Sequence, residues 1–253
     1  GSVLGPLLFL IYINDLAYSQ CTCNSNKCTA NCTNSASFIL FADDTNLFVD
    51  GKSPNEVITK INLILSKLKK YLEANYLHIN ISKSKYLHFK PPRKKVDLPT
   101  IDVKFGGIPL ENVEHMKFLG VVIDEKLSWK KHILTVENKV RNSIGQLYDM
   151  RKVIPKKLGT TIYNAIVNSQ LSYAIAVWGG RENDLHKLFI LQKRALRNLF
   201  GIKKVSKFVR GHTKQIFHSK KILTVFNIYK HATILNFAKM VLNKEPEYLC
   251  KLL

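Results

Sequence analysis

Two adjacent carboxylates, Asp43 and Asp44, are the residues of this sequence whose types and spacing most directly suggest chemistry. Neighbouring negative charges repel each other and resist burial, but a divalent cation placed between them removes that cost. Mg²⁺ prefers hard oxygen ligands and keeps positions for substrate phosphates, and two such ions can hold the attacking and leaving oxygens of a phosphoryl transfer. A plain Asp-Asp turn is a common alternative, so the pair alone leaves the choice open.

Short apolar runs with a preference for β-strands flank the two aspartates, in residues 37–42 and 45–49. This pattern predicts a β-hairpin with Asp43 and Asp44 at its turn. A helix is predicted before it, over residues 6–18, and we expect that helix to be buried because it is apolar nearly all round.

A second helix is predicted to begin at Ser53, which is followed by Pro54 and Glu56 in a capping box. Apolar residues at helical spacing extend this helix to Leu72, over about five to six turns. Gly106 and Gly107 indicate a tight turn between two of the short strands that follow. The strands are expected in residues 77–81, 86–89, 101–105, 108–110 and 117–123.

The periodicity becomes helical after Trp129, and Gly201 is expected to end the third helix of this second part. The chain is therefore predicted to be α+β in its first part and helical in its second, with a boundary near residues 125–130. The candidate helices of the second part cover residues 130–152, 156–174, 183–200 and 222–243.

The net formal charge of +21 is concentrated in the second part of the chain. Residues 1–124 hold 14 Lys and Arg against 11 Asp and Glu, whereas residues 125–253 hold 25 against 7. Such an imbalance favours a polyanionic partner, and it exceeds what a well-solvated lysine surface needs. We therefore favour nucleic acid as the partner. The apolar run at residues 7–13 is too short for a membrane span and lacks the basic leader of a signal peptide. We expect an intracellular protein, nuclear and cytoplasmic, without membrane contact.

Four of the five cysteines lie close together in one polar run: Cys21, Cys23, Cys28 and Cys32. A structural zinc site is one interpretation, but the usual C-x2-C spacing is absent. A surface loop with free thiols in a reducing compartment is therefore favoured. The histidines are scattered without metal-binding spacing, so we assign them no metal.

The two aspartates belong to a larger pattern, because Phe41-Ala42-Asp43-Asp44 resembles the catalytic hairpin of reverse transcriptases of non-LTR retrotransposons. Residues 1–16 resemble the segment that precedes it in that family, where a Gly-led turn and a helix touch the template and the incoming nucleotide. Other segments resemble jockey-like or CR1-like polymerases, and this ordered set is more specific than any single motif. These segments are residues 80–85, 118–124, 173–179 and 191–195.

The resemblance implies an RNA-directed DNA polymerase that uses Mg²⁺ or Mn²⁺, an RNA template, a DNA primer and deoxynucleoside triphosphates. It implies an α+β fold with a partial polymerase palm, an antiparallel sheet with packed helices, in residues 1–125. A helical, basic, thumb-like region would follow in residues 126–253.

The resemblance also implies roles for single residues. Asp43 would be a metal ligand and Asp44 a supporting one. Either Lys83 or Lys85 would neutralise or protonate the leaving pyrophosphate, although a solvated hairpin edge explains these lysines equally well. Template and nucleotide contacts would come from Gly1, Ser2, Gly5 and Pro6. The primer end would be held by Phe118, Leu119 and Gly120, a role that is compatible with a buried strand.

Basic residues of the second part are the candidates for phosphate contacts, whereas its helix aromatics are assigned to the core. The assigned residues are Arg194, Arg197, Lys203, Lys204, Lys207 and Arg210.

Two departures from the family pattern affect the expected activity. The family takes a further metal-binding Asp from a strand that would precede Gly1, and the polar loop at residues 20–36 is longer than expected. We therefore expect a truncated and inactive piece of a polymerase. The competing hypothesis is a non-catalytic RNA- or DNA-binding module derived from such an element. A metal nuclease is disfavoured, because no His or Glu cluster accompanies the aspartates.

Overall fold

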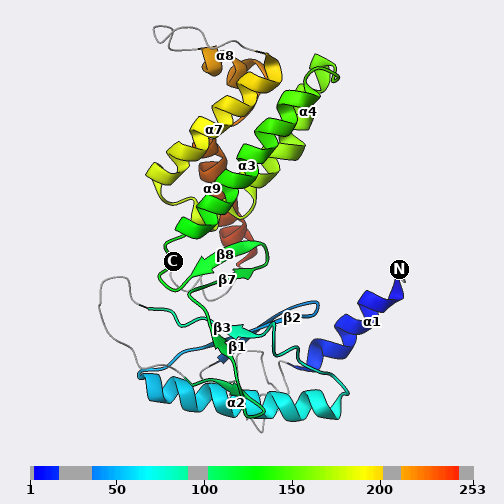
Figure 1. The fold of residues 1–253 in the computed structure, drawn as a ribbon, viewed down its shortest axis with the longest axis vertical. Coiled ribbons are helices and arrows are strands. Elements are labelled where there is room, and N and C mark those ends of the chain that lie inside the picture. Colours follow the sequence, from blue (N-terminus) through cyan, green and yellow to red (C-terminus); the bar gives the residue numbers. More distant parts are fainter. Residues whose placement is uncertain (1–2, 17–35, 91–101, 202–211, 245–253) are drawn as a thin grey trace. The chain divides into compact units, whose positions relative to one another are not determined.

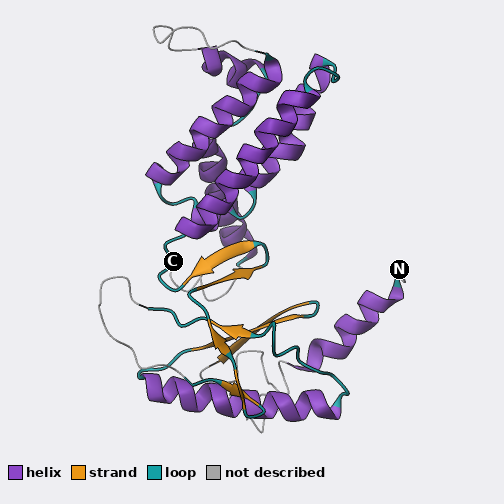
Figure 2. Ribbon diagram, in the orientation of Figure 1, coloured by secondary structure: helices purple, strands orange, loops and turns teal. Residues whose placement is uncertain are grey.

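The computed structural model describes residues 3–16, 36–90, 102–201 and 212–244 (Figure 1). The chain divides into two compact units, Gly1–His115 and Met116–Leu253, each with a hydrophobic core of its own. Helices and small two-stranded sheets give a mixed α+β structure (Figure 2). The division falls before residues 125–130, so the hairpin around Gly120 lies in the unit of the later helices.

The first unit is built on α2 (Pro54–Ala74), which begins at the expected capping box. The Ser53 hydroxyl accepts a hydrogen bond from the Glu56 N–H at 3.3 Å, which satisfies a backbone donor that the first helical turn leaves unpaired. The apolar stripe of α2 contributes Leu65, Leu68 and Leu72 to the core of this unit. Ile13, Leu16, Val103 and Phe105 complete that core.

The strands of the first unit form small sheets. β1 (Ala36–Phe41) and β2 (Asp44–Val49) pair antiparallel, which confirms the predicted hairpin. β4 (Lys104–Phe105) and β5 (Ile108–Pro109) pair across Gly106-Gly107, whose positive φ angles of 59° and 88° suit the predicted turn. β3 (Lys85–Tyr86) pairs in parallel with β6 (Glu111–Asn112).

The helix predicted at residues 6–18 is confirmed as α1 (Leu4–Ile13) and a 3-10 turn, Asn14–Leu16, but the expectation that it is buried was wrong. Only Ile13 and Leu16 are buried, because α1 and the 3-10 turn contact the described core of this unit through Phe9, Ile13 and Leu16, and the other side chains of α1 lie away from it. Among the described residues, no helix is both long enough and apolar enough to cross a membrane.

The second unit is framed by α3 (Lys130–Met150) and α7 (Glu182–Phe200), which lie side by side (Figure 1). α9 (Val225–Asn243) packs against α7. The predicted stop at Gly201 is confirmed, since Gly201 caps α7 in the left-handed conformation with φ 68°. The short elements are β7 (His115–Phe118), β8 (Val121–Asp124), α4 (Gly159–Tyr163), α5 (Ser169–Ser172), α6 (Ile175–Trp178) and α8 (His212–Ser219).

The helix predicted at residues 156–174 is interrupted by a π-helical turn, Asn164–Asn168, between α4 and α5. Tyr163, Val167 and Leu171 are all fully buried. Residues spaced by four drift around an ordinary α-helix of 3.6 residues per turn, so the wider π turn keeps these three side chains on one face. Helix α8 was not predicted.

Candidate functional site

The hairpin β1–β2 places both aspartates at its exposed end. Phe41 pairs with Asp44, so Ala42 and Asp43 form the two-residue turn, with Ala42 at a positive φ of 51°. Both carboxylates are exposed, and neither makes a hydrogen bond or ion pair with another described residue. Two free carboxylates at one turn offer hard oxygens to a divalent cation.

The two faces of this hairpin differ. Leu40 and Leu47 pack against the core of the first unit. On the opposite face, Ile39 and Phe48 are 43% and 39% exposed, and Phe41, next to the turn, is 61% exposed. The described sheet contains β1 and β2 alone. The hairpin therefore anchors the aspartates from one side and leaves an apolar face in solvent.

A turn organised by Asn80 replaces the strand that was predicted at residues 77–81. The Asn80 side-chain carbonyl accepts hydrogen bonds from the Ser82 hydroxyl at 2.7 Å and from the Lys83 N–H at 3.3 Å. Asn commonly diverts the backbone in this way. Lys83 is exposed and makes no ion pair with a described residue. Lys85 pairs with Glu111 at 2.8 Å, across the β3–β6 pairing.

Gly5 and Pro6 lie in the exposed first turn of α1. Gly1 and Ser2, which were assigned to the same contact, lie outside the described residues, as does the cysteine-rich segment. In the part of the chain that the structure describes, no group of three His, Cys, Asp or Glu residues could hold a metal ion.

The residues expected to hold the primer end form the turn of a second hairpin. Phe118 ends β7, Leu119 and Gly120 form the turn, and Val121 begins β8. The φ angles of Leu119 and Gly120 are 42° and 85°, the sign pattern of a type I′ turn. The sequence pattern had suggested one strand over residues 117–123. The Tyr173 hydroxyl donates a hydrogen bond to the Leu119 carbonyl at 2.5 Å.

The segment after this hairpin is fixed by Asp124, a residue that sequence reasoning did not single out. Its buried carboxylate accepts hydrogen bonds from the N–H groups of Lys126, Ser128 and Trp129 and from the Ser128 hydroxyl, at 2.9–3.1 Å. Burial alone would raise the pKa of Asp124, but these hydrogen bonds outweigh it and hold the pKa below its ordinary value. An Asp a few residues before a helix was the signal available in the sequence.

His132 links the hairpin to α3. Its Nδ1 accepts a hydrogen bond from the Val122 N–H in β8 at 3.1 Å, and its ring meets the Trp178 ring edge-on at 5.3 Å. Burial, and then the charge of Lys139, lower the pKa of His132 below its ordinary value. The neutral imidazole is therefore the form that fits this site.

The candidate nucleic-acid residues that the structure describes lie on α7. Arg194 is exposed and Arg197 half-buried. They are three positions apart, so they share one side of the helix. Neither forms an ion pair with another described residue. Four further candidates, Lys203, Lys204, Lys207 and Arg210, lie outside the described residues.

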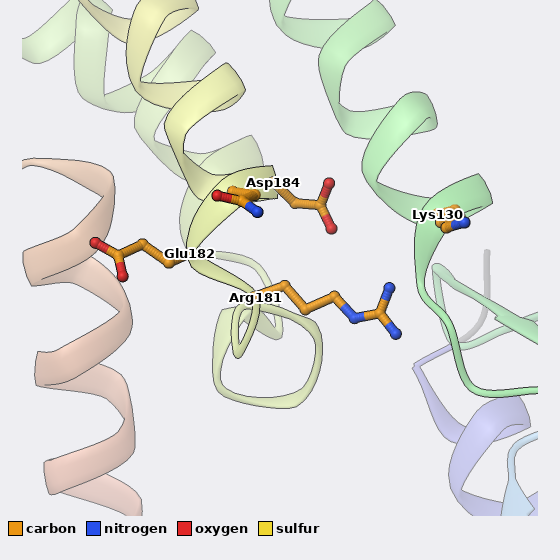
Figure 3. Close-up of a pocket in the computed structure, with 5 residues that line it drawn as sticks. Lys130, Arg181, Glu182 and Asp184 are labelled. Atoms are coloured by element: carbon orange, nitrogen blue, oxygen red, sulfur yellow. The ribbon is translucent and has the colours of Figure 1, made fainter. Parts of the chain in front are cut away.

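An open depression of about 510 Å³ lies between the first turns of α3 and α7. Figure 3 shows Arg181 extending toward Lys130 across it, while Glu182 points to the opposite side. Asp184 pairs with Lys187 at 3.4 Å. The depression offers two cations to a phosphate, but its two acidic residues balance their charge, so the exposed side of α7 is the stronger candidate.

Comparison with known proteins finds similarity over most of this chain. Residues 1–123 match the family described as reverse transcriptase (RNA-dependent DNA polymerase). The chain is 24% identical over 238 residues to the probable RNA-directed DNA polymerase from transposon X-element of Drosophila melanogaster, covering 92% of this chain and 24% of that protein. It is 26% identical over 205 residues to the RNA-directed DNA polymerase from mobile element jockey of Drosophila funebris. This similarity covers 79% of this chain and 21% of that protein.

The chain thus spans about a quarter of the length of these curated relatives. No solved structure gives a significant match. The match to the family and the similarity to the relatives together cover the aspartate hairpin, the Leu119–Gly120 turn and the helices that follow. Residues 1–123 therefore match the reverse transcriptase family, and over most of its length the chain is similar to RNA-directed DNA polymerases of non-LTR mobile elements.

Proposed function

We propose that this chain is the catalytic-hairpin and thumb portion of an RNA-directed DNA polymerase that extends a DNA primer on an RNA template. The observation that carries the proposal is the pair of exposed carboxylates, Asp43 and Asp44, at the turn of β1–β2 within residues that match the reverse transcriptase family. The first unit corresponds to part of a palm. The later helices correspond to a thumb that grips the nucleic acid.

Asp43 and Asp44 would hold Mg²⁺ or Mn²⁺. Both carboxylates are solvent-facing and free of other described partners, and hard oxygen ligands of this kind suit these ions. Metal ions bound there would stabilise charge on the attacking and leaving oxygens of a nucleotidyl transfer. Asp43 at the tip is the main ligand, and Asp44, held by its pairing with Phe41, supports it.

The remaining assigned residues would position the substrates. Lys83 makes no ion pair with any described residue and is the better placed of the two lysines to neutralise the pyrophosphate, because Lys85 pairs with Glu111. Gly5 and Pro6 would contact the template and the incoming nucleotide. The Leu119–Gly120 turn would contact the primer end, and the basic side of α7 the phosphate backbone.

The test is to replace Asp43 with Asn in a full-length polymerase that carries these residues. Asn keeps the size of the side chain but removes the charge that a metal ion needs, so we expect primer extension to be abolished and primer–template affinity to stay near normal. Asp50→Asn is the matched control, since Asp50 is an exposed carboxylate that follows β2. Extension at the parental rate by the Asp43→Asn protein would disprove the assignment.

The second candidate function is a non-catalytic RNA- or DNA-binding module. It is favoured by the charge of residues 116–253, which hold 26 Lys and Arg against 8 Asp and Glu, and by the presence of only two carboxylates at the hairpin turn. We expect the 253-residue chain by itself to bind a primer–template without extending it. Extension by the full-length polymerase separates the two functions, because only the polymerase hypothesis requires it.

A further inference from the structure

The Leu119–Gly120 turn is held in a conformation that its own sequence does not favour. Both residues have positive φ angles, 42° and 85°. Glycine adopts such angles freely, whereas leucine meets a steric clash between its Cβ and the backbone. Asn or Asp is the usual residue at the position of Leu119 in such a turn. Contacts from outside the turn must therefore stabilise it.

Tyr173 supplies such contacts, although it lies 54 residues away along the chain. Its hydroxyl donates a hydrogen bond to the carbonyl oxygen of Leu119 at 2.5 Å. Its ring lies against Gly120, because a Cβ added to that glycine would stand 3.2 Å from the Cε1 atom of Tyr173. One tyrosine thus contacts both residues of the turn.

Tyr173 is itself fixed by the core of the second unit. It follows α5 and leaves the helix with ψ 116°, while its N–H still bonds to Ser169. Its carbonyl accepts a hydrogen bond from the indole N–H of Trp178 at 2.9 Å, and Trp178 is only 1% exposed. Tyr173 itself, by contrast, is 54% exposed. The hydroxyl of Tyr173 therefore contributes its hydrogen bond to the Leu119–Gly120 turn and not to the core.

We propose that Tyr173 is a positioning residue that sets the conformation of the Leu119–Gly120 turn, and through that turn the placement of the primer end. The second part of this statement rests on the proposed polymerase function. The first part concerns the chain alone. Loss of the Tyr173 hydroxyl should loosen the hairpin β7–β8 without unfolding the helices.

The first experiment compares Tyr173→Phe with Tyr148→Phe in the 253-residue chain by amide hydrogen exchange of residues 115–124. Tyr148 is the matched control, since it is a half-exposed tyrosine on α3 whose ring stacks on Arg151 and whose hydroxyl has no described partner. We expect exchange to be about fivefold to tenfold faster in Tyr173→Phe, the effect of one lost hydrogen bond, and unchanged in Tyr148→Phe. Unchanged exchange in Tyr173→Phe would overturn the proposal.

The second experiment repeats Tyr173→Phe in a Leu119→Asn background. Asn tolerates a positive φ, so the turn should depend less on the hydroxyl and the effect of Tyr173→Phe on exchange should shrink. A merely structural tyrosine would show the same effect in both backgrounds, and that result would refute the positioning role.

The third experiment measures primer extension by a full-length polymerase carrying the same substitutions. We expect Tyr173→Phe to lower kcat several-fold while the Kd for primer–template stays within about twofold, because most affinity comes from phosphate contacts elsewhere. An unchanged kcat in an active enzyme would refute the link to the primer. A parental polymerase that does not extend at all would remove the proposed function, while the exchange data would still decide the role of Tyr173 in the turn.

Discussion

Asp124 and His132 show how single polar side chains join a strand to a helix in this chain. The Asp124 carboxylate accepts hydrogen bonds from three N–H groups of the loop that follows β8. His132 accepts a hydrogen bond from the Val122 N–H of β8 itself. The two residues lie on either side of Trp129, which directly precedes α3 and has a positive φ of 61°. Hydrogen bonds to buried groups therefore fix the direction in which the chain leaves the hairpin.

His132 makes the stability of the second unit depend on pH. Its pKa in the folded chain lies below the ordinary value of 6.5, mainly because it is buried. As the pH falls below 6.5, the His132 imidazole becomes protonated in the unfolded chain but stays neutral in the folded chain, so the free energy of unfolding decreases. The stabilisation is complete above pH 6.5 and is lost as the pH approaches the folded pKa.

Denaturant unfolding between pH 5.5 and 7.5 measures this slope. We expect His132→Asn to flatten the dependence relative to the parent chain, whatever its absolute stability. His186→Asn, at an exposed position on α7, should leave the slope as it is. The expectation would be contradicted if the free energy of unfolding of the parent chain did not decrease as the pH was lowered from 6.5 to 5.5.

Gly179 lies where α6 ends beside α9, at a position with no room for a side chain. A Cβ at this position would lie 2.6 Å from the Ile175 carbonyl oxygen and 2.7 Å from Cδ2 of Tyr229. The φ of Gly179 is −79°, so the backbone itself would accept any residue. Glycine is required here by the Ile175 carbonyl oxygen of α6 and by the Tyr229 ring of α9, and a substitution tests this close packing directly.

Gly179→Ala should lower the free energy of unfolding by about 1–3 kcal/mol, because an added methyl group overpacks a filled contact. Gly145→Ala is the matched control with the opposite expected sign. Gly145 lies exposed within α3, and an added Cβ would meet no atom within 4 Å, so the better helix propensity of Ala should add about 0.5–1 kcal/mol. Equal effects of the two substitutions on the melting temperature would argue against the close approach.

Over the whole molecule, the features that the sequence predicted well are those encoded locally. The β1–β2 hairpin, the capped start of α2 and the end of α7 at Gly201 follow from neighbouring residues, and all are confirmed. The contact of Tyr173 with Leu119 joins residues far apart in sequence, and no local pattern indicates it. The π-helical turn at residues 164–168 likewise depends on which side chains the core accepts. Periodicity alone also overestimated the burial of α1, since an apolar helix is buried only where other elements cover it.

The charge distribution is the property of the whole molecule that leads to the last prediction. Residues 1–115 hold 13 Lys and Arg against 10 Asp and Glu, whereas residues 116–253 hold 26 against 8. Each phosphate neutralised by a protein cation releases counterions, so binding by such a surface weakens steeply with salt. Most of the nucleic-acid affinity, and most of its salt dependence, should therefore arise in the second unit.

The paired substitution Arg194→Glu and Arg197→Glu tests this in the intact 253-residue chain. We expect it to weaken primer–template binding at least about tenfold at low salt and to reduce the slope of log affinity against log salt by about two, one for each lost phosphate contact. Lys52→Glu with Lys70→Glu makes the same change in formal charge at exposed positions of the first unit. If affinity depended only on net charge, the two pairs would weaken binding equally. A larger effect of the α7 pair shows instead that the exposed basic side of α7 contacts the phosphates, whereas equal effects would place the contacts elsewhere.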